Sequence, residues 1–275
     1  MITLKTSLVA LFSLWCALLA SPANSEEVYQ FGVVPQYEQR KLYAIWRPVI
    51  EELTRRTGLK FNLVATLTVT DFERELSRGS YDLVYANPYH ILRESSGQGY
   101  IPLVRDKLPL RGIIVVKKDS SLKTPHELHE KELAIPSWNA LGASLLIRAD
   151  LEQVYKAVPK ATNVKTHSSV YMNVALGLTP AGGGVEKTLQ EQPQTIRDQL
   201  RIIYTTREMP SHPIAAHPRM PALVRDKIQK TLLEMAATDA GKQLFADIPI
   251  DSMIPTSMKD YQPMKQWGLD TYWVN

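Results

Sequence analysis

The sequence predicts an α/β protein whose sheets are mostly parallel, on three observations. Short β-branched runs alternate with segments of helical periodicity, a pattern typical of parallel sheets flanked by helices. Polar turns directly follow several of these runs, where ligands of such sheets usually bind. The length of 275 residues exceeds one typical core and suits two lobes.

The N-terminus has the features of a secretory signal peptide. Lys5 supplies a positive start, the apolar run over residues 8–20 is too short for a bilayer span, and small residues lead to a cleavage site after Ser25. An uncleaved membrane anchor is the alternative. We expect residues 1–25 to be removed, together with Cys16, the only cysteine, and the product to be exported to the periplasm.

The composition of the remaining chain excludes several classes of protein. Without Lys5 it keeps 31 basic and 28 acidic residues, a net charge of about +3 that is too small and too dispersed for nucleic-acid binding. No second apolar run approaches a membrane span. We therefore expect a soluble protein, without disulfides, whose stability comes from its packed core.

The first segments alternate strands with helices. Residues 28–34 are β-branched and aromatic and predict a central strand. Apolar residues between positions 42 and 53 recur at helical spacing, with a kink or a new helix start expected at Pro48. Residues 61–69 predict a second strand. The sequence Thr-Asp-Phe-Glu over residues 70–73 has the form of a capping box that opens a short helix.

Three more strands follow in the same alternation. Residues 81–86 predict a third strand that ends at the strand-to-helix junction of residues 87–90. Residues 101–105 and 112–117 predict two further strands. Pro125 is well placed at the first position of the next helix.

Residues 134–149 combine a buried strand, a short polar turn and an amphipathic helix. A helix start leaves backbone N–H groups unpartnered and favours a bound anion. Ser137 and Asn139 are both good N-cap residues, and Gly142 and Ala143 leave room for a ligand. The alternative is an ordinary connection in which Asn139 caps its own helix and no ligand binds.

Residues 167–169 form a second polar turn, which opens a helix that Gly177 closes. The sequence Ala-Gly-Gly-Gly over residues 181–184 predicts a flexible loop, because it lacks the Lys and Ser/Thr of a phosphate-binding loop. Residues 201–206 and 212–217 predict short extended pieces that return between the lobes.

The C-terminal part predicts an amphipathic helix over residues 221–237 and then a tail rich in aromatic residues. We expect this tail, residues 260–273, to dock across the first lobe.

Several short phrases stand in a set order over nearly the whole chain after the signal peptide. They are Phe31-Gly-Val-Val-Pro35, Trp46-Arg-Pro48, Tyr81-Asp-Leu before Asn87-Pro-Tyr89, Val115-Val-Lys-Lys-Asp-Ser120, His167 ten residues before Gly177, and Met209-Pro-Ser-His-Pro213. In order and spacing these phrases resemble the periplasmic phosphonate-binding family, the solute-binding proteins of ABC importers for phosphonate, phosphite and phosphate-like oxyanions.

The resemblance implies a two-lobed periplasmic binding protein fold of type II. Two α/β lobes would be joined by two crossing strands and would clamp the ligand between them. Lobe 1 would comprise residues 26–110 and 209–275, and lobe 2 residues 111–208. The chain departs from the family at residues 137–140, where Ser-Trp-Asn-Ala replaces the usual Ser-Thr-Ser, and after Gly177, where the usual acidic residue is missing.

The candidate binding residues lie in the turns that these patterns place around one cleft. The aromatic residues could stack on a ligand or only pack the lobe interface. His167 could donate to an oxyanion or cap its helix. The set is Tyr37, Asn87, Tyr89, Ser137, Trp138, Asn139, His167, Ser168, Ser169 and Tyr171.

The sequence gives no reason to expect catalysis, a metal or a cofactor. It has no Gly-x-Ser-x-Gly motif and no cysteine nucleophile, and His126 and His129 form a metal pair without a third ligand. We expect a monomer that clamps a small oxyanion or zwitterion and delivers it to the permease of an ABC importer. The alternative is a ligand sensor that presents its bound state to a membrane histidine kinase.

Overall fold

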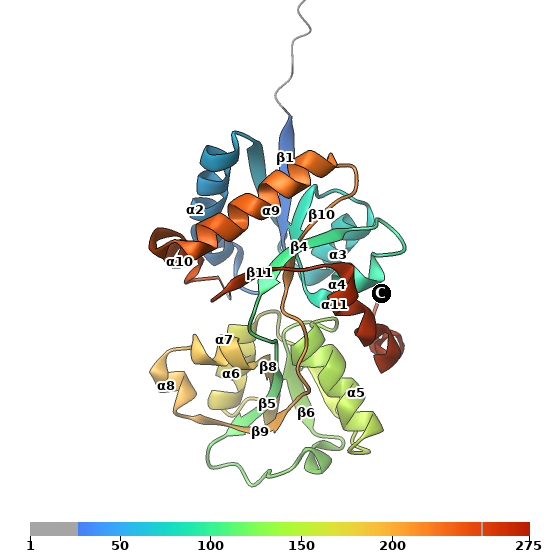
Figure 1. Ribbon diagram of the computed structural model, residues 1–275. Helices are drawn as coiled ribbons and strands as arrows, with labels where there is room; N and C mark the ends of the chain where they lie inside the picture. Colours follow the sequence, from blue (N-terminus) through green and yellow to red (C-terminus); the bar gives the residue numbers. More distant parts are fainter. Residues whose placement is uncertain (1–26, 249) are drawn as a thin grey trace, which may run out of the picture.

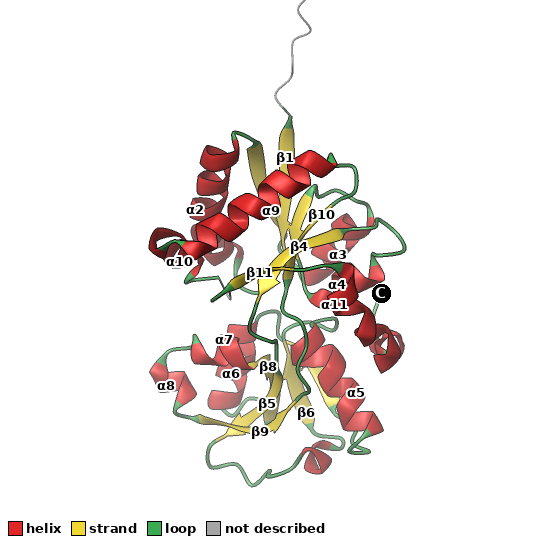
Figure 2. Ribbon diagram, in the orientation of Figure 1, coloured by secondary structure: helices red, strands yellow, loops and turns green. Residues whose placement is uncertain are grey.

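The computed structural model describes residues 27–248 and 250–275, so the expected signal peptide lies outside the described residues. This part of the chain forms two sheets, each covered by helices (Figures 1 and 2). We call the six-stranded sheet and its helices lobe 1, and the five-stranded sheet and its helices lobe 2. No helix within these ranges is long and apolar enough to cross a membrane.

Lobe 1 is built from both ends of the chain. Its sheet has the order β11-β4-β10-β3-β1-β2. The elements are β1 (Val28–Val33), α2 (Gln39–Thr57), β2 (Lys60–Ala65), α3 (Val69–Ser77), β3 (Leu83–Tyr85), α4 (Pro88–Arg93), β4 (Ile101–Asp106), β10 (Pro213–Ala216), α9 (Ala222–Ala237), α10 (Asp239–Phe245), β11 (Met253–Pro255), α11 (Met258–Tyr261), and the 3₁₀ helices η3 (Gln262–Trp267) and η4 (Leu269–Tyr272).

Lobe 2 takes the middle of the chain, and its sheet has the order β7-β6-β8-β5-β9. The elements are β5 (Gly112–Lys117), the 3₁₀ helix η1 (Pro125–Leu128), β6 (Glu132–Ile135), the π-helical turn η2 (Leu141–Leu145), α5 (Leu146–Gln153), β7 (Lys160–Asn163), α6 (His167–Ala175), β8 (Ala181–Val185), α7 (Glu186–Gln190), α8 (Gln194–Arg197) and β9 (Leu200–Thr205).

Both sheets are mixed rather than mostly parallel. In lobe 1, β1 pairs in parallel with β2 and β3, whereas β10 and β11 run antiparallel to their neighbours. In lobe 2, β6 pairs in parallel with β7 and β8, and β5 runs antiparallel to β8 and β9. The four strands β4, β5, β9 and β10 that adjoin the connections between the lobes all take part in antiparallel pairs, and so does β11, which follows α10.

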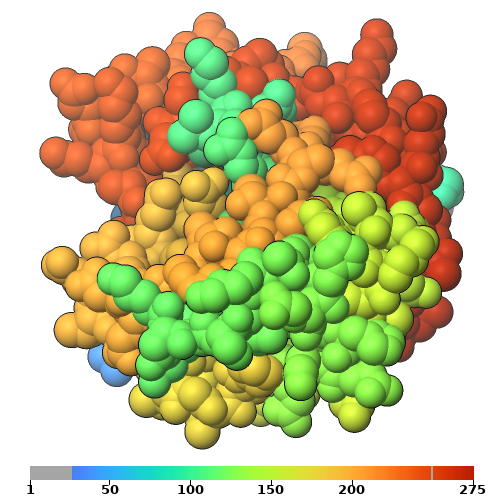
Figure 3. Space-filling view, turned by 90° about the horizontal axis from the view of Figure 1, so that it is seen from below, coloured from blue at the N-terminus to red at the C-terminus, as the bar shows by residue number. Residues whose placement is uncertain are grey.

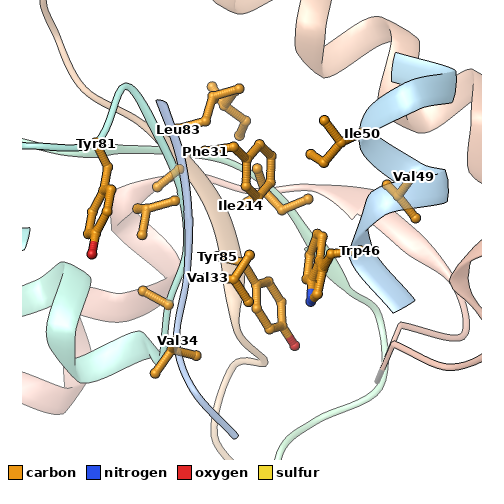
Figure 4. Packing of buried hydrophobic residues seen from close by; sticks show 14 of the residues in the cluster. Phe31, Val33, Val34, Trp46, Val49, Ile50, Tyr81, Leu83, Tyr85 and Ile214 are labelled. Atoms are coloured by element: carbon orange, nitrogen blue, oxygen red, sulfur yellow. The ribbon is translucent and has the colours of Figure 1, made fainter. Parts of the chain in front are cut away.

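The core of lobe 1 packs α2 against the first strands. The ring of Trp46 lies 5.4 Å from that of Phe31 and 4.9 Å from that of Tyr85, measured between centroids (Figure 4). All three side chains are almost fully buried. Helix α2 runs through Pro48 as one element and begins at Gln39, so Pro48 starts no new helix.

Two chain segments connect the lobes, between β4 and β5 and between β9 and β10 (Figure 1). They pair with each other at one point, where the N–H of Leu110 donates to the carbonyl of Met209 at 2.8 Å and the N–H of Met209 donates back at 3.0 Å. A pair of short connections held at a single bridge is suited to act as a hinge.

The prediction of a flexible loop over residues 181–184 is wrong. These residues begin β8, which is buried and lies in the middle of the lobe 2 sheet. The glycines let neighbours approach closely: a Cβ on Gly183 would lie 2.1 Å from the carbonyl oxygen of Ala143, and one on Gly184 would lie 2.3 Å from the hydroxyl oxygen of Tyr171. A glycine run looks like a loop by composition, and its packing role is visible only in the sheet.

Gly183→Ala is expected to destabilise the protein by about 3 kcal/mol, because the backbone oxygen it would strike cannot move as a side chain can. Gly97→Ala is the matched control, since its Cβ would meet only the end of the Glu94 side chain, at 3.0 Å. Calorimetric melting of both variants checks this. Equal melting temperatures would contradict the tight packing of β8.

The second strand and the following helix begin and end earlier than expected. Strand β2 ends at Ala65, and Thr68 rather than Thr70 caps α3, with its hydroxyl accepting from the N–H of Asp71 at 3.0 Å. The chain offers threonines at both positions. With the helix starting after Thr68, its first residue, Val69, lines the space between the lobes.

The C-terminal segment touches both lobes rather than the first alone. Helices α11 and η3 contact α4, and η4 contacts α5 of lobe 2. The guanidinium of Arg148 on α5 donates to the carbonyl of Tyr272 at 2.6 Å. Seen from below, the red C-terminal segment lies against the yellow-green residues of α5 (Figure 3).

Candidate functional site

A small cavity of about 30 Å³ lies between the lobes, next to the connecting segments. It is formed by loops that follow strands of both sheets, at the positions expected for a ligand of an α/β protein. Lobe 1 contributes Val34, Pro35, Gln36, Val69, Asn87, His90 and His212; lobe 2 contributes Pro136, Ser137, Ala140, Leu141, Gly142, Ala143, Lys165, His167 and Val185, and Leu110 comes from a connection.

The lobe 2 wall consists of the turn after β6 and the helix start that follows it. Ser137 is only 5% exposed, and its hydroxyl has no hydrogen-bond partner among the described residues. The first N–H groups of a helix lack intrahelical acceptors, and here Leu141, Gly142 and Ala143 line the cavity. This wall therefore offers donors whose partner would have to come from the cavity.

Asn139 does not cap this helix. The residue before η2 is Ala140, which makes no side-chain cap. The Asn139 amide instead donates to Glu73 at 3.1 Å and to the carbonyl of Val274 at 2.7 Å, and its oxygen accepts from the N–H of Val274 at 3.0 Å. Both ends of the amide are occupied by these contacts, so Asn139 holds the C-terminal segment against the cleft.

Asn87 shapes the lobe 1 wall. Its side-chain oxygen accepts from the N–H groups of Tyr89 at 2.9 Å and His90 at 3.0 Å, which fixes the start of α4. Its amide nitrogen donates across the cleft to the carbonyl of Asn139 at 3.2 Å. Asn87 thus positions His90 and ties the two lobes in the closed arrangement.

Three imidazoles face the cavity: His90, His167 and His212. His90 Nε2 lies 2.9 Å from a carboxylate oxygen of Glu73 and 3.0 Å from the amide nitrogen of Asn87. His90 Nδ1 is buried without a partner in the described part of the chain. His212 stacks on Tyr85 with centroids 5.4 Å apart.

Two of these imidazoles are neutral at neutral pH. Burial lowers the pKa of His167 to about 4. Burial, with the nearby His90 and His167, lowers the pKa of His212 to about 3. A neutral imidazole has one N–H donor and one acceptor nitrogen, so His167 and His212 offer the cavity polar groups without a positive charge.

A second, larger pocket of about 660 Å³ opens beside this cavity at the mouth of the cleft. It shares Pro35, Val69, Pro136, Ser137 and Lys165 with the cavity, so the two spaces adjoin. We call it the vestibule.

Contacts from α7 and the residue that follows it join lobe 2 to lobe 1. The Tyr37 hydroxyl donates a short hydrogen bond to Glu191 of lobe 2, and burial raises the pKa of that carboxyl. Lys187 of lobe 2 pairs with Asp251 of lobe 1 at 2.7 Å. The structure is therefore a closed form.

A model of the family described as periplasmic substrate-binding proteins of phosphonate ABC transporters matches residues 31–261. That span covers most of the chain. The chain belongs to this family. It is a family of substrate-binding proteins rather than of enzymes. No curated protein sequence matches the chain.

Solved structures confirm the type II two-lobed fold expected for the family. PhnD1 from Prochlorococcus marinus, in complex with methylphosphonate, aligns with a TM-score of 0.81 and 14% identity, over 90% of this chain and 100% of that chain. The binding protein component of a phosphonate ABC transporter from Pseudomonas aeruginosa aligns with a TM-score of 0.76 and 14% identity, over 91% of this chain and 90% of that chain. A Xanthomonas citri protein bound to ATP aligns with a TM-score of 0.73 and 15% identity, over 89% of this chain and 98% of that chain.

The structure brings six of the ten candidate residues to the cleft. Asn87, Ser137 and His167 line the cavity. Tyr37, Trp138 and Asn139 line the vestibule, together with Ser137.

The other four candidates do not line either space. Tyr171 is fully buried in lobe 2, and its hydroxyl bonds Val185 and Thr188. Tyr89 packs against Trp273 in the cluster under the C-terminal segment. Ser169 bonds Thr166, the residue that caps α6, and Ser168 follows His167 away from the cavity wall. For Ser168, Ser169 and Tyr171 the reason is helical geometry. His167 at the start of α6 faces the cavity, and the residues that follow it along the helix point in other directions.

Sequence reasoning missed His90, His212, Gln36 and Lys165, which all line the cavity. His212 precedes β10 immediately after the connection between lobes, so its position beside a crossing segment could have singled it out. His90 lies inside α4. No signal in the sequence indicated a binding role there, because a histidine inside a helix usually packs against its neighbours. Lys165 has a positive φ of 78° in the turn before α6.

The expected weak metal pair is engaged by backbone groups. His126 Nδ1 lies 2.7 Å from the carbonyl oxygen of Tyr155, and His129 Nδ1 accepts from the N–H of Val158 at 3.2 Å. No group of three or more His, Cys, Asp or Glu side chains suited to a metal occurs in residues 27–248 and 250–275.

Proposed function

We propose that this protein binds a small tetrahedral oxyanion of phosphorus, such as a phosphonate, phosphite or phosphate monoanion, and delivers it to an ABC importer. The observation that carries the proposal is the buried, unpartnered hydroxyl of Ser137 on the wall of a closed interlobe cavity. A buried polar group without a partner costs about 1–3 kcal/mol, which a ligand oxygen would recover.

The polar groups of the cavity suit an oxyanion that carries a proton. Ser137 and the helix start supply donors, and Lys165 supplies a positive charge at the junction with the vestibule. The neutral imidazoles supply acceptor nitrogens as well as donors. An acceptor favours a P–OH group, which sulfate at neutral pH does not possess. We therefore expect phosphonate and phosphite to bind more tightly than sulfate.

Binding would couple to closure of the lobes about the bridge between Leu110 and Met209. That bridge supports lobe boundaries after residue 110 and before residue 209. In the open form, each lobe would keep one half of the cavity. The ligand would join the halves, and contacts such as Tyr37 with Glu191 would form on closure.

A thermal-shift panel tests the ligand class. Methylphosphonate, phosphite and phosphate, each at about a hundred times its dissociation constant, are expected to stabilise the protein by about 2.7 kcal/mol. Sulfate at the same concentration serves as the control for a general anion effect. If none of the phosphorus oxyanions raises the melting temperature, the proposed ligand class is wrong.

The family favours a permease over a sensor kinase as the membrane partner. We propose a periplasmic monomer, released from a signal peptide at residues 1–25. Deletion of the gene should abolish uptake of labelled methylphosphonate by intact cells. Normal uptake with loss of a ligand-induced transcriptional response would instead assign the protein to sensing.

A further inference from the structure

The vestibule beside the cavity has an apolar character that a naked oxyanion does not use. Leu67, Val69 and Trp138 line it from opposite lobes. Leu67 is 78% exposed, although it lies at the mouth of a closed cleft. A large apolar side chain gains free energy when another apolar group covers it.

Trp138 is held in place by its own lobe. The guanidinium carbon of Arg148 lies 5.4 Å from the Trp138 ring centroid, and the same guanidinium donates to the Trp138 carbonyl at 2.8 Å. The indole also packs against the core of lobe 2. A fixed ring that still lines an open space is a preformed surface for a flat or aliphatic group.

The vestibule adjoins the cavity. Ser137, the buried hydroxyl of the cavity wall, lines both spaces, and so does Lys165. A tetrahedral head at Ser137 would therefore direct a substituent toward Trp138. The vestibule measures about 660 Å³, against about 30 Å³ for the cavity.

Charge limits what the substituent can carry. The vestibule is lined by the carboxylates of Glu38, Asp71 and Glu73, whereas Lys165 is the one basic side chain among its described lining residues. Asp71 is paired with Arg74 at 2.6 Å, but Glu38 and Glu73 still outnumber Lys165. A second anionic group on the ligand would therefore meet an excess of negative charge.

We propose that the ligand is an organic phosphonate or phosphate monoester whose apolar or aromatic substituent, without a second negative charge, occupies the vestibule between Leu67 and Trp138. This inference rests on the proposed function, because it places the oxyanion head in the cavity. It adds the class of the substituent, which the cavity alone does not specify.

Isothermal titration with four phosphonates tests the proposal. Benzylphosphonate is expected to bind at least about tenfold more tightly than methylphosphonate, because its ring covers exposed apolar surface. 3-Phosphonopropionate is expected to bind more weakly than propylphosphonate, since it adds a carboxylate to the same chain. Equal or weaker binding of benzylphosphonate, with methylphosphonate still bound, would overturn this inference and leave the proposed function intact. Failure of all four phosphonates to bind would overturn this inference, and failure of phosphite and phosphate as well would overturn the proposed function.

Leu67→Ala localises the effect. The ratio of benzylphosphonate to methylphosphonate affinity should fall about threefold or more in this variant, as one apolar contact is lost. Leu223→Ala is the matched control, because Leu223 is 83% exposed on α9 and does not line the vestibule. An unchanged ratio in Leu67→Ala would place the substituent elsewhere and overturn the assignment.

Discussion

Ser137→Asp is expected to reduce the affinity for methylphosphonate by roughly a thousandfold. Two like charges about 4 Å apart at a partly screened protein site repel by about 4 kcal/mol. Ser137 is 5% exposed on the cavity wall, so the new carboxylate could not turn into bulk water. Isothermal titration at pH 8, where the carboxylate is ionised, measures the loss.

Two companion variants separate charge from folding. Ser137→Ala should reduce the affinity for methylphosphonate only about ten- to a hundredfold, which is the contribution of one hydrogen bond to a charged group. Ser121→Asp adds the same charge at an exposed position of lobe 2 and should bind as the unchanged protein does. If Ser137→Asp melts normally and keeps full affinity, the oxyanion does not bind at this turn.

The ligand-free protein is expected to lose roughly 4 kcal/mol of stability between pH 7 and pH 5 through His167 and His212. Their folded pKa values of about 4 and about 3 lie below the usual value of 6.5. The unfolded chain therefore binds more protons than the folded one below pH 6.5. The contribution is fully present above pH 6.5 and is lost as the pH falls toward 4 for His167 and toward 3 for His212.

Urea denaturation at pH 7, 6 and 5 measures how steeply the free energy of unfolding falls as the pH is lowered. His167→Gln and His212→Gln should each reduce this slope, because each removes one buried titrating group. His129→Gln, at an exposed position of lobe 2, should leave the slope unchanged. A slope that survives the double variant would show that other groups carry the acid sensitivity.

A bound oxyanion should oppose this loss of stability. At the proposed site its negative charge would lie beside the imidazoles and would favour their protonated forms. The difference in stability between pH 7 and pH 5 should then be smaller with saturating methylphosphonate than without it. An identical difference would indicate that the anion binds away from His167 and His212.

The sequence was most informative where a segment follows one regular pattern. The strands from residue 28 and residue 112, and the helix over residues 221–237, are confirmed within one or two residues. The resemblance to the family is confirmed as well. Ordered motifs over most of the chain specify a family even when each motif alone is weak. The prediction of a loop over the glycine run of β8 was wrong because the composition of that run is that of a loop. The close contacts with Ala143 and Tyr171, which explain the glycines, are visible only in the folded protein.

The sequence by itself determined the α/β class, the family and the turns that meet at the cleft. Only the tertiary structure decided which side chains of those turns face the cavity. Asn139 and Tyr171 satisfy their polar groups within the protein, whereas Ser137 and His90 Nδ1 have no partner among the described residues. The physical reason is that local periodicity fixes the direction of a segment, while the packing of two lobes decides which polar atoms remain free for a ligand.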